Sequence, residues 1–302
     1  MRINGVEIED TYAEAFHMTA ARIIITAVDH RWARIAAQST IGFATSIIGC
    51  GCEGGIEAEL AETETPDGRP GISLLLMTRT REDMEKQLPL RVGQGVMTCA
   101  TTACFNGLTS SETVAVGANL RFFGDGWQIS KLVTEPPCAD RDGRRFWRIP
   151  VMEGEFLVED RFGIQRAIAG GNLLILGQSA ERALAAAESA VAAIRSIRGV
   201  ALPFPGGVVR SGSKVGSHYK FLRASTNEAF CPTLRPLVAS SLPEGVNSVL
   251  EIVIIGLDED AIRAAMKVGA EAACQPGIVR ISAGNYGGRL GKVHIHLREL
   301  WS

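Results

Sequence analysis

The sequence lacks the features of several large protein classes. No apolar run approaches the ~20 residues that a membrane-spanning helix needs, so we expect no membrane insertion. An excess of charge is also missing, because 31 Lys and Arg residues nearly balance 33 Asp and Glu residues, for a net charge of −2. This balance gives no electrostatic basis for binding nucleic acid. The first ten residues, MRINGVEIED, resemble neither a secretory signal nor a transit peptide, so we expect a cytoplasmic protein.

A metal-binding pattern is missing as well. The seven cysteines are odd in number and scattered, and most lie among small or apolar residues, which is typical of reduced, buried thiols. Cys50 and Cys52 form a single C-x-C without a second pair. His294 and His296 could share one face of a strand, but no third ligand is evident. We therefore predict no metal site.

Two glycine-rich segments fall short of nucleotide-binding loops. Residues 207–215 approach a phosphate loop, but Ser213 separates the second glycine from Lys214, and Val215 stands where a hydroxyl is required. Residues 49–54 match G-x-G-x-x-G, but an acidic stretch with turn signals follows instead of a helix with an apolar face. We predict neither a Walker site nor a dinucleotide site.

The elements that are present suggest about two domains, which fits 302 residues with 46% apolar content. Ser, Thr or Asp stands before each expected helix as a potential N-cap, at Asp29, Thr80, Ser179 and Asp258. Apolar, β-branched runs predict strands at 21–27, 43–48, 72–78, 95–102, 172–176, 249–255 and 278–282. Residues 111–160 suggest β-hairpins with turns at 122–126, 140–143 and 152–154.

The two halves of the chain repeat one pattern. A strand, a short turn, an acidic helix start (82–83 and 259–260) and a return strand occur in each half. Two β-α-β pairs per half predict an α+β fold, namely two ferredoxin-like α/β sandwich lobes related by internal duplication, with inserted β-hairpins. We place the domains at residues 1–149 and 150–302.

The stretch 201–227 stands out because it has no clear periodicity yet is too apolar for a disordered segment. It is rich in backbone-exposing glycines, hydroxyls and basic side chains, which suit a polar or anionic ligand. The candidate substrate-binding residues are Gly206, Gly207, Ser211, Ser213, Lys214, Ser225, Thr226 and Asn227. The alternative is an ordered surface loop with solvated cations, in which Ser225, Thr226 and Asn227 only close a turn.

Glu251 is the candidate catalytic residue, because it interrupts the apolar strand VLEIVII. A carboxyl group among apolar side chains loses hydration, which raises its pKa and favours the neutral acid. A neutral acid can donate a hydrogen bond to an oxyanion or relay a proton. The alternative is a charge on a locally exposed strand edge, which would discourage edge-to-edge pairing.

Many short motifs together resemble one protein family. They are INGVEIEDTYAEAF near the start, then ETPDGRPG, FFGDG, EGEFLVEDRFGI, AGGN, PFPGG, SKVGS, ASTN, CPT, EIVI and SAGNYGG. In number and order they are similar to the formylmethanofuran–tetrahydromethanopterin formyltransferases, from Ile3 to the C-terminus. The resemblance implies two ferredoxin-like lobes, a homo-oligomer, and direct formyl transfer without a metal or prosthetic group. The family's proposed active-site acid lies on the strand that matches EIVI, which corresponds to Glu251.

The resemblance also suggests a setting. The 25 Arg against 6 Lys and the many Ala residues are typical of a GC-rich bacterial genome, so the chain is similar to the version in methylotrophic bacteria. That version implies methanofuran and tetrahydromethanopterin as substrates and a metal-dependent formylmethanofuran hydrolase complex as partner, in formaldehyde oxidation. The alternative is a non-catalytic subunit that only docks the carrier coenzyme for the hydrolase.

Overall fold

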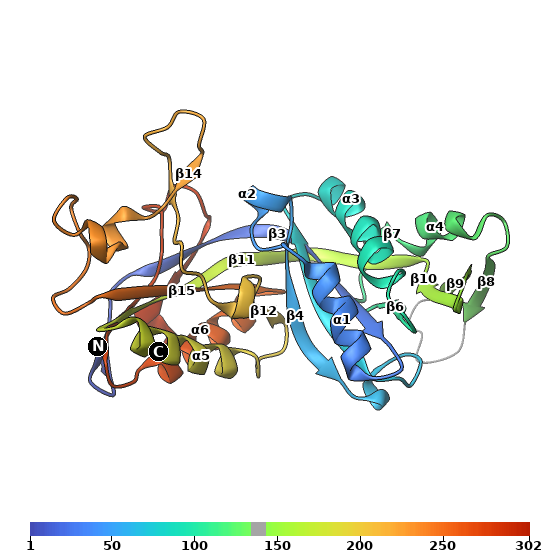
Figure 1. Ribbon diagram of the computed structural model, residues 1–302, viewed down its shortest axis with the longest axis horizontal. Coiled ribbons are helices and arrows are strands. Elements are labelled where there is room, and N and C mark those ends of the chain that lie inside the picture. The colour runs from blue at the N-terminus through green and yellow to red at the C-terminus, as the bar shows by residue number, and fades with distance from the viewer. Residues whose placement is uncertain (134–142) are drawn as a thin grey trace. The chain divides into compact units, whose positions relative to one another are not determined.

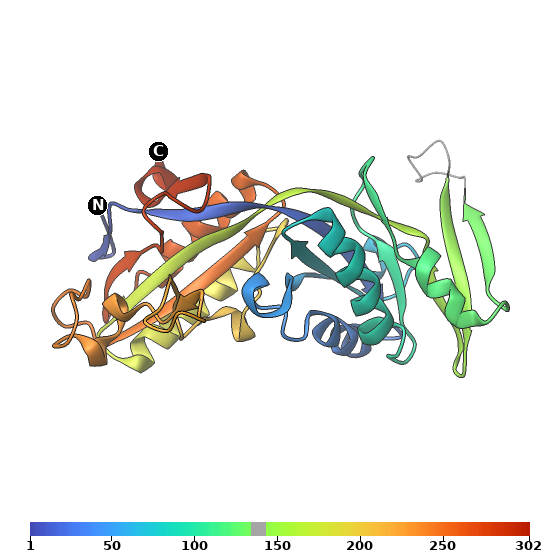
Figure 2. The ribbon, with the colours of Figure 1, turned by 90° about the horizontal axis from the view of Figure 1, so that it is seen from above.

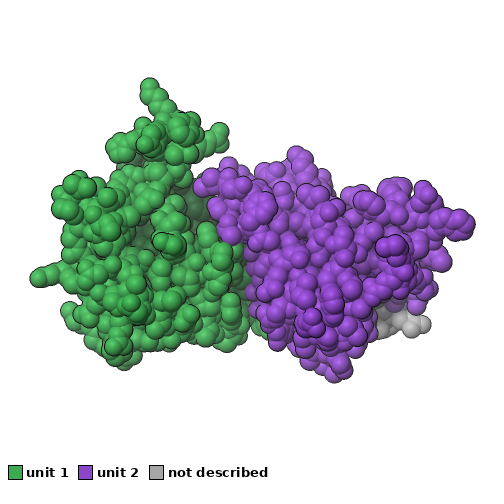
Figure 3. Space-filling view, viewed as in Figure 1, with its two compact units in different colours: residues 1–17, 168–302 green, residues 18–167 purple. Residues whose placement is uncertain are grey.

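The computed structural model describes residues 1–133 and 143–302, which form two compact units. Unit 1 contains residues 1–17 and 168–302, and unit 2 contains residues 18–167 (Figure 3). The strands β3 (Tyr12–Thr26) and β11 (Arg161–Gly177) contribute residues to both units. In the described part of the chain, no helix has the length and apolarity needed to cross a membrane.

Unit 2 is built around an antiparallel sheet with the order β4-β5-β3-β6. Its elements follow β3 along the chain as α1 (His30–Ile41), β4 (Glu53–Leu60), β5 (Gly71–Thr78), α3 (Arg81–Arg91) and β6 (Ala103–Asn106). The predicted N-caps are confirmed, since Asp29 accepts a hydrogen bond from the Trp32 N–H and Thr80 from the Asp83 N–H. Both helices share an apolar core with the sheet that includes Ile25, Leu74 and Met84.

The strand predicted at 43–48 is wrong. Gly42 ends α1, with its N–H bonded to the Gln38 carbonyl, and a short helix α2 (Ile47–Cys50) follows. The apolar side chains of this run do not face a core, because Phe43 is 73% and Ile48 71% exposed. The return strand is instead β4, which begins at Glu53, within the G-x-G-x-x-G pattern of residues 49–54.

The strand predicted at 95–102 is also wrong. The chain leaves α3 through a π-helical turn, Val92–Val96, and β6 begins only at Ala103. Gly95 in this turn approaches α1 so closely that a Cβ atom would lie 2.6 Å from the Thr40 hydroxyl oxygen. The apolar residues of this segment therefore pack as a turn against a helix.

The region after β6 contains the expected β-hairpin with its turn at 152–154. The elements of this region are β7 (Thr113–Ala115), α4 (Gly117–Leu120), β8 (Ile129–Val133), β9 (Arg144–Val151) and β10 (Gly154–Glu159). The hairpin turn predicted at 122–126 is wrong, because a 3₁₀ helix, Arg121–Gly124, occupies it and the strand before it pairs with β11. Antiparallel pairing joins β8 to β9 and β9 to β10, as Figure 2 shows for the adjacent β8 and β9. The predicted turn at 140–143 lies almost wholly outside the described residues.

Unit 1 repeats this arrangement with the order β16-β11-β15-β12, again antiparallel. Its elements after β11 are α5 (Ala180–Ile194), β12 (Val200–Ala201), β15 (Ser248–Gly256), α6 (Glu259–Ala273) and β16 (Ile278–Ser282). The predicted caps Ser179 and Asp258 accept hydrogen bonds from the Arg182 and Ala261 N–H groups. Figure 1 shows α5 and α6 on one side of β11 and β15.

Short strands complete unit 1 at its N-terminal side. They are β1 (Arg2–Ile3), β2 (Val6–Ile8), which pairs with β16, and β17 (Val293–His296), which pairs with the first residues of β3. The sheet face away from the helices is covered by residues 202–247, which include the small hairpin β13 (Lys214–Val215) and β14 (Ala224–Ser225) (Figure 1). Val246 of this segment packs against Leu174 and Leu176 of β11 in an apolar cluster between the segment and the sheet.

Candidate functional site

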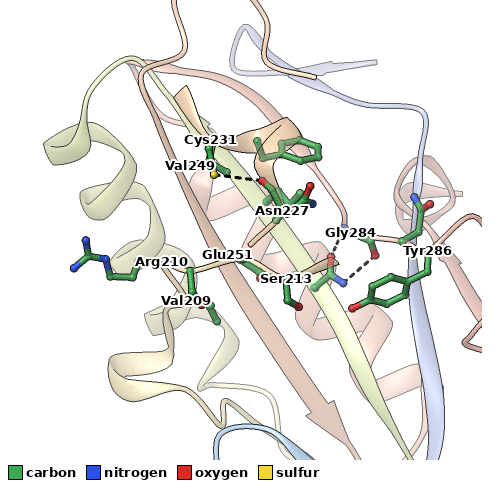
Figure 4. A pocket seen from close by; sticks show the side chains of 15 residues that line it. Val209, Arg210, Ser213, Asn227, Cys231, Val249, Glu251, Gly284 and Tyr286 are labelled. Atoms are coloured by element: carbon green, nitrogen blue, oxygen red, sulfur yellow. Dashed lines mark hydrogen bonds between the residues drawn. The ribbon is translucent and has the colours of Figure 1, made fainter. Parts of the chain in front are cut away.

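A cavity opens on the sheet face of unit 1 that the helices leave free, and Figure 4 shows the side chains around it. Strands β11 and β15 form its floor, and three loops form its walls. The lining residues are Asn172, Leu174, Val209, Arg210, Ser211, Gly212, Ser213, Asn227, Phe230, Cys231, Val249, Glu251, Gly284, Asn285 and Tyr286. The structure thus brings Glu251 together with three of the predicted substrate-binding residues, Ser211, Ser213 and Asn227.

Glu251 lies in the middle of β15, opposite Leu174 of β11. Side chains alternate along a strand, so its neighbours Leu250 and Ile252 turn toward the helices and Glu251 turns into the cavity. Burial raises the pKa of its carboxyl group to about 7 from an ordinary 4.5. Among the described residues, no side chain forms an ion pair or hydrogen bond with this carboxyl group, so desolvation alone accounts for the shift.

The loop that follows η4 (Pro205–Gly207) reaches the cavity through a pairing with β15. Val209 forms an isolated antiparallel bridge with Glu251. Beyond this bridge, Ser211 and Ser213 line the cavity, and Figure 4 shows Ser213 beside Glu251. The same figure shows the Arg210 side chain extending away from Glu251. The wall next to the acid therefore consists of hydroxyl and backbone groups.

A second wall comes from the segment that follows β16. Asn172 of β11 holds this segment with its side-chain amide, which accepts from the Gly284 N–H at 2.6 Å and donates to the Gly284 carbonyl at 3.1 Å. Asn285 and Tyr286 follow, and Figure 4 shows the Tyr286 hydroxyl pointing toward the cavity. A phenol at this position can donate or accept a hydrogen bond.

The other predicted substrate-binding residues lie outside the cavity lining. Gly206 and Gly207 belong to η4, where Gly207 packs so closely against Val191 and Leu202 that a Cβ atom would lie 2.9 Å from each. Lys214 forms an ion pair with Glu228.

The remaining two candidates are Ser225 and Thr226. The Ser225 hydroxyl donates to the Gly216 carbonyl at 2.8 Å, and Thr226 is exposed between β14 and Asn227. These positions shape or follow the loop rather than line the cavity.

A metal site is not evident in residues 1–133 and 143–302, where no three His, Cys, Asp or Glu side chains gather closely enough to hold an ion. The six described cysteines are free thiols, and burial raises the pKa of Cys52 to about 12 and that of Cys274 to about 11. Cys231 lines the cavity, and its thiol donates to the Asn227 carbonyl at 3.4 Å. The polar groups that line this cavity are the Glu251 carboxyl group, hydroxyls, amides, the Arg210 guanidinium and the Cys231 thiol.

Two family models match almost the whole chain. One, described as formylmethanofuran-tetrahydromethanopterin formyltransferase, matches residues 1–151, and the other, described as FTR, proximal lobe, matches residues 154–300. The chain belongs to the formylmethanofuran–tetrahydromethanopterin formyltransferase family. The resemblance drawn from the sequence motifs is thereby confirmed, and the chain is a formyltransferase.

Relatives of this formyltransferase match over their full length. The formylmethanofuran–tetrahydromethanopterin formyltransferase of Methylococcus capsulatus is 55% identical, with 99% of each chain covered. The solved enzyme of Methanosarcina barkeri is 50% identical with a TM-score of 0.93, covering 99% of this chain and 100% of that one. A chain of the formyltransferase/hydrolase complex of Methylorubrum extorquens, solved with methylofuran, is 48% identical with a TM-score of 0.95, covering 100% and 99%.

Sequence reasoning missed several residues of the formyltransferase cavity, above all Asn172, Asn285 and Tyr286. One available signal was Asn172 itself, a polar amide at the start of the apolar run NLLIL. A second was the SAGNYGG motif directly after a strand. Their convergence could not be inferred, because Asn172 meets Gly284 only through the pairing of β11 with β16.

Proposed function

We propose that this formyltransferase moves the formyl group directly between the amine of a methanofuran-type carrier and a ring nitrogen of tetrahydromethanopterin, with Glu251 as the acid of the reaction. The observation that carries the proposal is the Glu251 carboxyl group, which lies in the cavity, has no ion-pair partner among residues 1–133 and 143–302, and has a pKa of about 7. Such a group is neutral in a large fraction of molecules near neutral pH, so it can donate a proton or a hydrogen bond.

The chemistry of transfer defines what the acid does. The acceptor amine attacks the formamide carbon, its nitrogen forms the new C–N bond, and the carbonyl oxygen becomes an oxyanion in a tetrahedral intermediate. Glu251 in its neutral form donates a hydrogen bond to that oxyanion or a proton to the departing nitrogen. The old C–N bond then breaks, and the acceptor nitrogen loses the proton that restores the carboxylic acid. No covalent enzyme intermediate is needed.

Alignment of the two carriers supplies a second contribution to the rate. Holding two reactants in the correct geometry can correspond to an effective molarity of about 10⁵ M or more. Ser211, Ser213, Asn227 and Tyr286 line the cavity with hydroxyl and amide groups that can orient polar carriers. We assign direct substrate contacts to these cavity residues. The other predicted positions, Gly206, Gly207, Lys214, Ser225 and Thr226, are proposed to support binding indirectly, because they shape or follow the same segment.

The fold that carries this site is a mixed α/β architecture that matches the Methanosarcina barkeri enzyme. We infer two ferredoxin-like sandwiches that arose by duplication. The common strand order of the two units supports this, with the first strand central and the third and fourth at its sides in each. The predicted division at residues 149/150 remains our proposal for the domains, and the two family models meet between residues 151 and 154.

We further propose that the chain acts with a metal-dependent formylmethanofuran hydrolase in formaldehyde oxidation, and that it forms a homo-oligomer. The similarity to a chain of the Methylorubrum extorquens complex supports the hydrolase partner. The relatives in methylotrophic bacteria support the pathway. Free thiols at all six described cysteines fit a reducing compartment, and we place the protein in the cytoplasm.

The proposal is tested by the purified protein alone. It should move the formyl group from formylmethanofuran to tetrahydromethanopterin, and this activity should survive dialysis against a chelator. Binding of the carriers without transfer would instead favour the non-catalytic docking subunit. Activity that a chelator abolishes and zinc restores would mean that the cavity residues described above are not the whole catalytic apparatus.

A further inference from the structure

The segment between β16 and β17 is held by an unusual carboxylate. Glu14 lies on β3, is 1% exposed, and has no cation bonded to it among the described residues. Four backbone N–H groups donate to it instead. One oxygen accepts from Tyr286 at 2.7 Å and Gly288 at 2.8 Å, and the other accepts from Leu290 and Gly291 at 2.6 Å each. Burial raises the pKa of Glu14, but the four hydrogen bonds outweigh this and lower it overall, so the carboxylate is charged.

The loop is shaped to fit this carboxylate. Gly291 approaches β3 so closely that a Cβ atom would lie 2.4 Å from the Ala15 carbonyl oxygen. Gly287 and Gly288 adopt positive φ angles, 70° and 71°, which turn successive N–H groups to one side. The Glu14 backbone N–H also donates to the Gly284 carbonyl at 3.3 Å. The loop is therefore folded around one buried charge.

The same loop forms a wall of the cavity that contains Glu251. Gly284, Asn285 and Tyr286 all line it. The Asn285 side chain does not serve the cavity, because its amide donates to the Thr11 hydroxyl and the Tyr12 carbonyl. The Tyr286 ring packs near the Phe16 ring, with centroids 6.3 Å apart, and Figure 4 shows its hydroxyl pointing toward the cavity. The N–H group of this same residue is one of the four that bind Glu14.

We propose that Glu14 is a positioning residue of the formyl transfer: its buried carboxylate fixes the loop 284–291 and thereby holds Tyr286 at the wall of the Glu251 cavity. This inference rests on the proposed function. It assigns Glu14 no contact with the carriers. Its effect reaches the reaction through the place of Tyr286, which orients a carrier and limits the access of water to Glu251.

The variant Glu14→Gln tests this role, because it keeps the shape of the side chain and removes its charge. One carboxylate oxygen becomes an NH₂ group, which must face two N–H donors and can accept from neither. The backbone amides of Tyr286, Gly288, Leu290 and Gly291 should then exchange hydrogen faster than in the wild type. With Tyr286 displaced, kcat/KM should fall, by up to about a hundredfold for a displacement near 1 Å.

A pH profile separates positioning from general destabilisation. In the wild type, activity should decline as pH rises through about 7, where Glu251 loses its proton. The other ionisable side chains around the cavity are Arg210, Cys231 and Tyr286, and desolvation alone raises the Glu251 pKa. If Glu14→Gln lets water into the cavity, this decline should move to lower pH, by about one unit.

The matched control is Glu57→Gln in unit 2. Glu57 is a buried carboxylate that accepts from Arg22 and from the Ser73 hydroxyl. Its replacement should lower Tm but leave kcat/KM and the pH of the decline unchanged. A Glu14→Gln enzyme with the wild-type pH profile and kcat/KM would overturn the proposal.

A second variant decides the matter if Glu14→Gln does not fold. Tyr286→Ala leaves the carboxylate in place and removes the side chain that the loop presents, so it should show the same loss of kcat/KM and the same shift of the decline. Normal kinetics in Tyr286→Ala would overturn the positioning role. The wild type separates this outcome from failure of the proposed function, because a wild type without transfer activity refutes the function itself.

Discussion

Val209 and Glu251 exchange both of their backbone hydrogen bonds. The Val209 N–H donates to the Glu251 carbonyl at 2.7 Å, and the Glu251 N–H donates to the Val209 carbonyl at 2.9 Å. Through this pair, Val209 adds a single residue to the edge of the sheet beside β15. The pairing fixes the start of the loop that carries Ser211 and Ser213. The acid and the hydroxyls, which are far apart in sequence, become neighbours because of it.

Replacing the acid should slow the reaction without weakening binding. Glu251→Gln keeps the shape and a hydrogen-bond donor but cannot exchange a proton. We expect kcat to fall about a hundredfold, or ~3 kcal/mol of transition-state stabilisation, while KM changes little. Steady-state kinetics with both carriers measures this. Glu244→Gln, which changes an exposed glutamate near the start of β15, serves as control and should behave as the wild type.

The same variant should stabilise the protein at alkaline pH. The pKa of Glu251 is about 7 in the folded state against 4.5 in an ordinary setting, so the folded state binds this proton more tightly. The contribution of this bound proton to the free energy of unfolding is fully present below pH 4.5. It is lost as pH rises through 7, which lowers the free energy of unfolding by about 3 kcal/mol at most. Glu251→Gln should therefore match the wild type at pH 4 and exceed its free energy of unfolding at pH 8. An equal difference at both values would show that the carboxyl group is not desolvated.

The serine positions separate cavity contacts from loop structure. Ser213 lines the cavity, whereas the Ser225 hydroxyl is bonded to the Gly216 carbonyl. Ser213→Ala should raise KM for one carrier about three- to tenfold, as expected for one lost hydrogen bond. Ser225→Ala should leave KM unchanged. The reverse result would move the binding surface from the cavity to the β13–β14 hairpin.

Unit 2 holds an ion pair where unit 1 holds the acid. Ser73 in unit 2 and Glu251 in unit 1 each lie the same number of residues before the cap of the following helix, Thr80 and Asp258. Arg22 and Asn172 likewise lie equally far before the caps Asp29 and Ser179. Arg22 and Ser73 both bond to the buried Glu57. The position that would correspond to the cavity floor is thus occupied by internal hydrogen bonds.

This ion pair should contribute to stability and not to catalysis. Glu57→Gln leaves Arg22 without its anion, and since a quarter of the Arg22 side chain is exposed, we expect a loss of about 2–3 kcal/mol, somewhat less than for a fully buried pair. Denaturant unfolding measures this loss. Transfer kinetics below the unfolding transition should be unchanged, and a large drop in kcat there would mean that unit 2 takes part in the reaction.

The helices could be predicted from sequence more closely than the strands. All four predicted caps accept the expected backbone hydrogen bond, because capping depends on residues three positions apart. The strand at 278–282 was predicted with its observed bounds, Ile278–Ser282, because it is a short apolar run. The return strand β12 has only two residues, and β4 mixes acidic and apolar side chains, so neither had a recognisable local pattern.

In the candidate site, too, features that depend on local sequence could be predicted and features that depend on distant contacts could not. Glu251 could be selected because a single charge in an apolar strand is a local feature. The convergence of Asn172, Glu14 and Tyr286 could not be predicted, because it depends on contacts between segments that are distant in the chain. Lys214, which the sequence suggested as a ligand contact, forms an ion pair with Glu228 and lies outside the cavity lining, so its contact with a ligand stays a prediction.

Association with a hydrolase is the last prediction, and it follows from the direction of one-carbon flow. A transferase alone only equilibrates formyl groups between two carriers, so release of the formyl group as formate requires hydrolysis of the formylated carrier, a step without any change of oxidation state. We expect a second subunit to perform this hydrolysis. We expect the native protein to co-purify from cell extract with a metal-dependent hydrolase, as the Methylorubrum extorquens relative was solved in a formyltransferase/hydrolase complex. Glu251→Gln should still co-purify, because Glu251 faces the cavity and we expect association to depend on other residues. Recovery of transferase and hydrolase activities in separate fractions would contradict the complex and favour a free transferase.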